Sequence, residues 1–242
     1  MSPMLIYFCI FVISFLVLIK WKFKSYFAWL ISQLCKGINK KLKDEKIELF
    51  YPLNELAVVK GKHQVKVLEL GGGSGANFGF IWTPVQWTVT EPNICFQSYF
   101  KENVSKFGGD HQIGEMKVAL GEDLSQFEEN SFDAVIATNV LCSVQNVAKV
   151  LSESKRVLKP GGIFYFFDHV RAKSDQKLMC KIQDFLSDSG LWPAMGDGCH
   201  LNRLIGDQVK SAGYARTNVK TREFINENNF ILRRIQYGHA IK

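Results

Sequence analysis

The residues with the clearest chemical meaning form a glycine-rich segment at positions 69–75, directly after a short apolar run. Glycine permits positive φ angles and lets a ligand approach the backbone without a Cβ in the way. A helix that begins after such a turn also offers free backbone N–H groups. The pattern therefore predicts a nucleotide-binding loop that uses Glu69, Gly71, Gly73 and Gly75.

An acidic residue, Glu91, follows this loop by about 20 residues and ends the next apolar run, directly before Pro92. An acid at that place in an open α/β sheet binds ribose hydroxyls. Gly71, Gly73 and Ala76 also fit the spacing of dinucleotide-binding loops, so an NAD-dependent enzyme is an alternative at this stage.

Alternating apolar runs and helical stretches predict a parallel α/β sheet, and this sheet would carry the loop and Glu91. Strands are expected at 65–70, 87–91, 116–119, 132–138 and 163–167. Helices are expected at 77–81, 93–106, 144–158 and 204–212. Two further strands, at 217–224 and 230–239, would form an antiparallel hairpin with its turn at 225–229. The expected fold is a seven-stranded, mostly parallel sheet of the Rossmann-like α/β class with an antiparallel edge hairpin.

The N-terminus is apolar from position 3 to 19 and is followed by Lys20, Lys22 and Lys24. Lysines after an apolar run favour a cytosolic location for the rest of the chain. Residues 1–31 are therefore predicted to be a membrane anchor that spans the bilayer once or lies in one leaflet. Residues 32–62 are predicted to be a linker and a helix at 45–60, and residues 63–242 a single domain.

The chain has 242 residues and a formal net charge of +7. Because many lysines lie beside the apolar N-terminus, the charge favours an anionic membrane surface as the partner over nucleic acid. None of the six cysteines stands in a C-x-x-C pair or at zinc-finger spacing, so free thiols and no metal site are expected.

Three later segments separate the alternatives. Gly-Glu-Asp at 121–123 follows the third expected strand, Asn-Ser-Phe-Asp at 130–133 leads into the fourth, and Leu-Lys-Pro-Gly-Gly at 158–162 leads into the fifth. Together with the glycine-rich loop, this ordered series resembles the class I S-adenosylmethionine-dependent methyltransferases over residues 64–167. The resemblance implies S-adenosylmethionine as the cofactor. It also implies that Glu122 or Asp123 contacts the adenine and that Asn139, Val140 and Leu141 border the methionine part.

A narrower resemblance extends almost from end to end. The segments 75–78, 140–144, 164–170, 197–199 and 237–242 are similar to the membrane-bound thiol S-methyltransferases of the endoplasmic reticulum and lipid droplets. That family implies methyl transfer to small alkyl thiols and hydrogen sulfide. The chain departs from the family pattern with Gly72 and Ser74 in the loop, Glu91 for Asp and Asp168 for Glu, and residues 171–203 match less well.

Asp168 and His169 follow the fifth expected strand, at the sheet edge where ligands bind. They are predicted to generate a thiolate or to orient the acceptor. Two further hypotheses remain from the sequence: a methyltransferase for another lipophilic small molecule, and a non-catalytic lipid-droplet protein that retains the fold.

Overall fold

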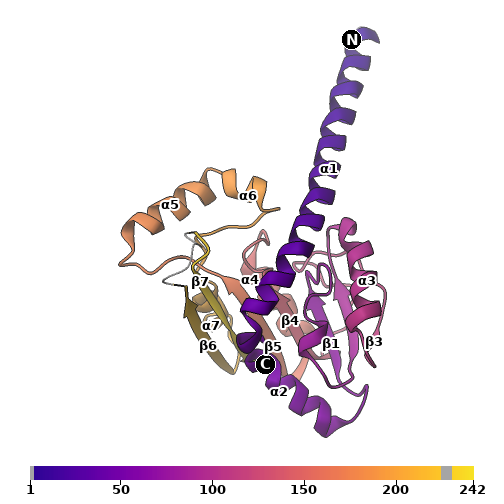
Figure 1. Ribbon diagram of the computed structural model, residues 1–242, viewed down its shortest axis with the longest axis vertical. Coiled ribbons are helices and arrows are strands. Elements are labelled where there is room, and N and C mark those ends of the chain that lie inside the picture. Colours follow the sequence, from indigo (N-terminus) through magenta and orange to yellow (C-terminus); the bar gives the residue numbers. More distant parts are fainter. Residues whose placement is uncertain (1–2, 225–230) are drawn as a thin grey trace.

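The computed structural model describes residues 3–224 and 231–242, without the side chains of residues 3–17 and 21. A seven-stranded sheet in the order β3-β2-β1-β4-β5-β7-β6 forms its centre (Figure 1). All neighbouring strands are parallel except β7, which runs antiparallel to β5 and β6. The strands are β1 (Lys66–Leu70), β2 (Gln86–Thr90), β3 (Gln112–Ile113), β4 (Phe132–Thr138), β5 (Leu158–His169), β6 (Arg216–Glu223) and β7 (Arg234–Ile241).

This sheet confirms the predicted mostly parallel topology with an antiparallel edge hairpin, but one predicted strand is wrong. Residues 116–119 form only an isolated bridge between Thr90 and Lys117, and β3 pairs with β2 in their place. The reason is exposure: Met116 is buried, but Val118 is 59% exposed and has no covering layer. The predicted turn at 225–229 lies outside the described residues.

The predicted helices at 45–60, 93–106, 144–158 and 204–212 are present with shifted ends, whereas 77–81 is a single 3-10 turn. That turn is short because Ile81 is already extended and Pro84 follows it. The sequence did not predict the helices at 177–188 and 191–195, which are the first two of the three described helices that follow β5. The helices are α1 (Pro3–Lys41), α2 (Lys43–Lys60), η1 (Phe78–Phe80), η2 (Ile94–Phe96), α3 (Gln97–Phe107), α4 (Val147–Val157), α5 (Lys177–Asp188), α6 (Leu191–Met195) and α7 (Ile205–Lys210).

Two apolar layers cover the two faces of the sheet because side chains alternate along each strand. On β1, Val67 packs into the layer beneath α2, with Phe50 and Trp87. Leu68, the next residue, packs into the opposite layer, which includes residues of α4 and α7. Parallel strands buried on both faces are expected to read as continuous apolar runs, as β4 does from residue 134 to 137.

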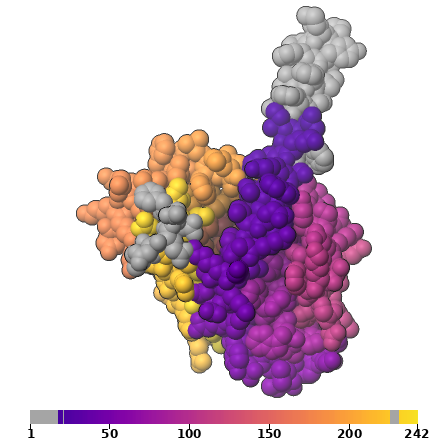
Figure 2. All heavy atoms as spheres, viewed as in Figure 1, coloured from indigo at the N-terminus to yellow at the C-terminus, as the bar shows by residue number. Residues whose placement is uncertain are grey.

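Helix α1 is continuous to Lys41, so positions 36–41, predicted as a linker, are helical. Its C-terminal half lies against the domain (Figure 2): Ala28 is buried, and the Asn93 side chain donates to the backbone oxygen of Lys24 at 3.1 Å. In the part of the chain that is described, we find no helix with the length and apolar character needed to span a bilayer. The predicted anchor falls largely on residues 1–17 and 21, whose side chains are not described, so the anchor and the domain division remain predictions.

The buried carboxylate of Asp133 joins the N-terminal ends of β1, β4 and β5. Asp133 of β4 accepts hydrogen bonds from Lys60 at 2.6 Å, Lys159 at 2.8 Å and the backbone N–H of Lys66 at 2.9 Å. Although burial opposes the effect, these donors hold the pKa of Asp133 below its usual value. The stabilisation is therefore present at neutral pH and is lost as the pH falls through that lowered pKa.

We expect Asp133→Ala to lower the free energy of unfolding by about 1–3 kcal/mol, because it leaves a partly buried backbone donor and two lysines without their acceptor. Urea unfolding at pH 7 measures the change. Asp110→Asn is the control, since Asp110 forms only an exposed pair with Lys62 at 3.7 Å and its loss should be within about 0.5 kcal/mol. Equal stability of Asp133→Ala and the wild type would contradict this role.

Candidate active site

The glycine-rich loop leaves β1 at the point where the strand order reverses, between β1 and β4. Gly71, Gly73 and Gly75 have φ angles of 57°, 52° and 76°, a region that favours glycine. A Cβ on Gly71 would lie 2.6 Å from Cγ2 of Val140, and a Cβ on Gly75 would lie 2.3 Å from the Phe78 ring. The loop is therefore held tightly against the residues that follow β4.

Glu91 lies one residue beyond β2 and anchors this loop. Its Oε2 accepts from the backbone N–H of Gly73 at 3.0 Å, and its Oε1 accepts from that of Asn93 at 2.9 Å. Burial raises the pKa of Glu91 to about 7. Because each carboxylate oxygen can accept more than one hydrogen bond, Glu91 can still receive ribose hydroxyls beside Gly73.

Glu69 of β1, directly before the loop, has a carboxylate oxygen without a regular hydrogen bond. Its Oε1 accepts from Nδ2 of Asn77 at 2.6 Å, whereas its Oε2 is buried without a hydrogen-bond partner. Burial raises the pKa of Glu69 to about 7. The indole N–H of Trp87 interacts with this carboxylate, but no regular hydrogen bond satisfies Oε2, so a ligand can donate to it. The ammonium group of S-adenosylmethionine fits this need, and Glu91 fits its ribose.

The N-terminal helices complete the polar network around Glu69, which the sequence did not reveal. Lys46 of α2 donates to Oδ1 of Asn39 at 2.7 Å and to Oδ1 of Asn77 at 2.8 Å. Asn39 of α1 in turn donates to the backbone oxygen of Ala76 at 2.6 Å. Burial lowers the pKa of Lys46 to about 8. Helices α1 and α2 thus form hydrogen bonds to Ala76 and Asn77, the two residues that follow the loop.

The other predicted cofactor contacts differ in their exposure and in the residues that they contact. Glu122 accepts from the backbone N–H groups of Gln145 and Asn146, before α4, and Asp123 is exposed. Asn139 is also exposed, with a positive φ of 55°, while Val140 contacts the glycine-rich loop. The predicted adenine contact of Glu122 or Asp123 remains a prediction.

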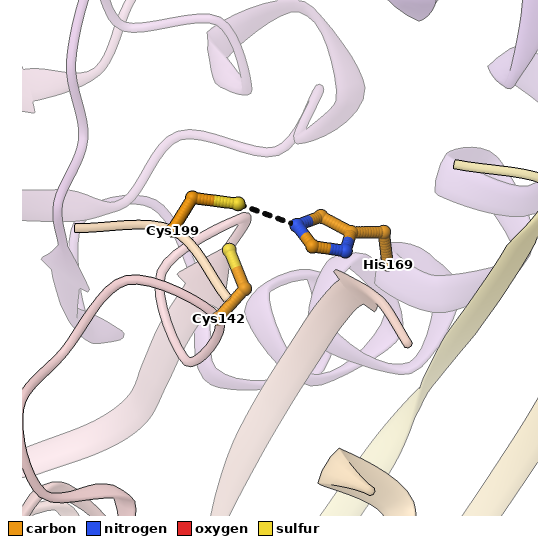
Figure 3. A group of neighbouring side chains, drawn as sticks. All are labelled: Cys142, His169 and Cys199. Carbon is orange, nitrogen blue, oxygen red and sulfur yellow. Dashed lines mark hydrogen bonds between the residues drawn. The ribbon is translucent and has the colours of Figure 1, made fainter. Parts of the chain in front are cut away.

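Three side chains from distant parts of the sequence meet beside this loop (Figure 3). Cys142 follows β4, His169 ends β5, and Cys199 lies in the segment after α6. Nε2 of His169 lies 2.9 Å from Sγ of Cys199, and the donor atoms of all three residues lie within 4.8 Å of one another. His169 was predicted from the sequence as a site residue; no spacing pattern pointed to Cys142 and Cys199, which only the fold brings together.

The side chains of this cluster shift one another's pKa values. The hydrogen bond from Cys142 lowers the pKa of the Cys199 thiol against the effect of burial, and His169 lowers it further. Burial opposes protonation of His169, but the adjacent Cys199 sulfur raises its pKa overall. The arrangement favours a Cys199 thiolate beside a His169 imidazolium. The indole N–H of Trp192 also donates to Cys199 Sγ, at 3.3 Å.

Asp168 is fully buried directly behind the cluster. Its Oδ1 accepts from the backbone N–H of Cys142 at 3.0 Å, and its Oδ2 has no hydrogen-bond partner. Burial raises the pKa of Asp168 to about 7. The carboxyl thus fixes the segment that carries Cys142 and retains one acceptor atom.

Three further hydrogen bonds join the segment at 141–144 to the residues at 200–203. Arg203 donates to the backbone oxygens of Leu141 and Val144, and the backbone N–H of His200 donates to the oxygen of Cys142 at 2.8 Å. Gly198, with a φ of 93°, approaches so closely that a Cβ would lie 2.8 Å from a backbone oxygen of the facing segment. The walls of the site are therefore rigid on this side.

Comparisons with known proteins agree with this geometry. Residues 68–166 match the family model described as a methyltransferase domain. The thiol S-methyltransferase TMT1B of Rattus norvegicus is 36% identical over 199 residues, covering 81% of this chain and 78% of the relative. The thiol S-methyltransferase TMT1A of Homo sapiens is 31% identical over 233 residues, covering 95% and 91%.

The fold also has counterparts among solved structures. A putative sarcosine dimethylglycine methyltransferase from Galdieria sulphuraria superposes with a TM-score of 0.58 at 17% identity. The match covers 82% of this chain and 84% of that one. At this identity the likeness concerns the fold alone.

Proposed function

Because this chain belongs to the thiol S-methyltransferase family of S-adenosylmethionine-dependent methyltransferases, we propose that it methylates a small, largely apolar thiol or hydrogen sulfide. One observation carries the proposal beyond the family match. The glycine-rich loop, with the unpartnered oxygen of Glu69, lies against the segment that leads from Val140 into the Cys142, His169 and Cys199 cluster. A cofactor on the loop and an acceptor beside the cluster are therefore neighbours.

The cofactor, when bound, supplies a methyl group on a positively charged sulfur. The chain's task is to hold the acceptor in line with that methyl and to exclude water. Glu91 would orient the ribose, and Glu69 would bind the ammonium group through its Oε2. Glycine at 71, 73 and 75 lets the cofactor rest directly on the backbone.

The acceptor side is built from the segments at 139–144 and 196–200, together with Asp168 and His169. A thiol is a few per cent thiolate at neutral pH and is intrinsically nucleophilic, so positioning contributes more than a strong base. Asp168 is here a positioning residue: it holds the backbone of Cys142, which the acceptor would meet.

We expect Asp168→Ala to lower kcat by about 10- to 100-fold while the Kd for S-adenosylmethionine stays within about twofold, because the segment carrying Cys142 loses its anchor. Asp168→Asn keeps an oxygen that accepts from the same N–H and should recover most of the turnover. Steady-state kinetics and calorimetry measure the two effects. If Asp168→Ala turns over like the wild type, Asp168 has no positioning role.

The acceptor class is tested with the full chain in detergent and labelled S-adenosylmethionine. Short alkyl thiols, alcohols and amines of equal chain length are compared, with the product identified by mass spectrometry. We expect the thiol to be methylated at least about 100-fold faster than the other two. Transfer to the alcohol or amine instead would favour another lipophilic acceptor. No transfer from a preparation that binds the cofactor would favour the non-catalytic hypothesis.

We further propose that the protein works at the endoplasmic reticulum membrane or the lipid-droplet surface, with residues 63–242 in the cytosol. The apolar run at 3–19 and the lysines after it support this location. Helices α5 and α6 add support, because Leu178, Phe185 and Met195 are 71%, 65% and 70% exposed. Exposed apolar side chains on these two helices suit contact with a lipid surface that delivers apolar thiols.

Flotation of the full chain with liposomes tests this second part. A triple change of Leu178, Phe185 and Met195 to Glu should weaken binding to the membrane surface and raise the KM for a long-chain thiol. The KM for hydrogen sulfide should stay unchanged. An unchanged KM for the long-chain thiol would contradict delivery across this face.

A further inference from the structure

We propose that Cys142, His169 and Cys199 bind one zinc ion, and that the open fourth position of the ion takes the sulfur of the acceptor thiol. The second half of this statement rests on the proposed thiol methylation, whereas the first half does not. Nothing in the spacing of the three residues along the sequence suggests a metal site, and only the fold brings their donor atoms together.

The geometry of the three donor atoms suits a tetrahedral ion. The two sulfurs and the imidazole nitrogen lie within 4.8 Å of one another, and Nε2 of His169 lies 2.9 Å from Sγ of Cys199. Zinc bonds of about 2.3 Å to sulfur and about 2.0 Å to nitrogen place tetrahedral ligands roughly 3.5–3.8 Å apart. The pair of His169 and Cys199 must open by about 0.6 Å, and a pair at the full 4.8 Å must close by about 1 Å, to hold the ion.

The chemistry of the donors selects the metal. Thiolates and imidazole favour zinc and reject magnesium and calcium, which require oxygen ligands. Two thiolates also neutralise a divalent cation, which suits a cluster in which Cys142 and His169 are buried. Within the described residues, the group contains three ligands. Three protein ligands and one open position are characteristic of zinc sites that bind a substrate.

The surroundings hold the two cysteine ligands in place before any ion arrives, whereas Nδ1 of His169 is buried without a hydrogen-bond partner. Asp168 fixes the backbone of Cys142, the indole of Trp192 donates to Cys199, and Arg203 fixes the segment from Leu141 to Val144. Such contacts behind the ligands orient them and raise metal affinity.

The open position would lie near the methyl donor. Val140, two residues before Cys142, lies against Gly71 of the glycine-rich loop. As the acceptor sulfur binds the ion, its S–H bond breaks and the proton passes to solvent. A remaining sulfur lone pair then faces the cofactor side.

Cobalt(II) substitution tests the site directly, because cobalt–thiolate absorption and tetrahedral d–d bands report the ligands. Reduced, tag-free full chain in detergent is titrated with Co²⁺ and, separately, by calorimetry with Zn²⁺. We expect one equivalent to bind, and a short alkyl thiol should intensify the charge-transfer band as a further sulfur binds. Cys142→Ser and Cys199→Ser should each lose the band, whereas Cys180→Ser, a buried thiol in α5, should keep it.

The outcomes separate the two proposals. No binding, or equal binding by the Ser variants that still bind S-adenosylmethionine, overturns the zinc site. If the ion binds and the thiol leaves the cobalt spectrum unchanged, or if metal-free protein methylates thiols at the full rate, the fourth-position half is wrong. If the ion and the thiol bind but no acceptor is methylated, the zinc site stands and the proposed function fails.

Discussion

Gly73→Asp should weaken S-adenosylmethionine binding by at least about 100-fold, or about 2.8 kcal/mol. Gly73 lies in the loop with a φ of 52°, and its N–H donates to Glu91. The new carboxylate would stand beside the buried Glu91 and occupy the space where a cofactor rests on the backbone. Calorimetric titration with S-adenosylmethionine measures the loss.

The space around Gly73 makes this variant informative about binding rather than folding. A Cβ at Gly73 would meet only the Phe96 ring, at an ordinary 3.7 Å. The matched control is Gly109→Asp, which introduces the same residue at a φ of 51° on an exposed turn with no atom within 4 Å. Both variants therefore carry similar backbone strain. Near wild-type affinity in Gly73→Asp would show that the cofactor does not lie on this loop.

Glu69→Gln should lower cofactor affinity by about 10- to 100-fold at pH 8, because a charge-assisted bond to the ammonium group is lost. It should also remove a pH dependence. Burial raises the pKa of Glu69 to about 7, and a bound ammonium group would lower it again. In the wild type, affinity should therefore fall as the pH drops through 7, and binding below that pH should release about one proton.

Calorimetry between pH 5.5 and 7.5, in two buffers with different ionisation enthalpies, counts the released proton. Glu91→Gln is the control, because burial also raises the pKa of Glu91 to about 7 but its expected partners are uncharged hydroxyls. That variant should bind more weakly and still release a proton. A wild type that releases none below pH 7 would contradict the pairing of Glu69 with the ammonium group.

The positions of four candidate site residues at the strand ends could be predicted from the sequence because their signals are local. A strand followed by glycines, an acid at the end of the next strand, and a polar pair after the fifth strand are each readable within a few residues. The structure places Glu69, Glu91, Asp168 and His169 at the carboxyl ends of their strands, as an open α/β sheet requires.

The remaining features depend on contacts between distant segments and could not be read locally. Lys46 reaches Asn77 across 31 positions, and Cys199 meets His169 across 30. Neither pair has a characteristic spacing. The strand predicted at 116–119 failed for a related reason: its apolar residues fit a strand pattern, but the fold leaves Val118 without a covering layer.

The positions of the cofactor and the acceptor can be seen in a crystal structure of the full chain in detergent with S-adenosylhomocysteine and a short alkyl thiol. We expect the adenosyl group on Gly71–Gly75, the ribose on Glu91 and the ammonium group on Glu69. We expect the thiol sulfur between the cofactor sulfur and the cluster of Cys142, His169 and Cys199. Density for the cofactor elsewhere, or a thiol bound away from that cluster, would contradict the proposed site.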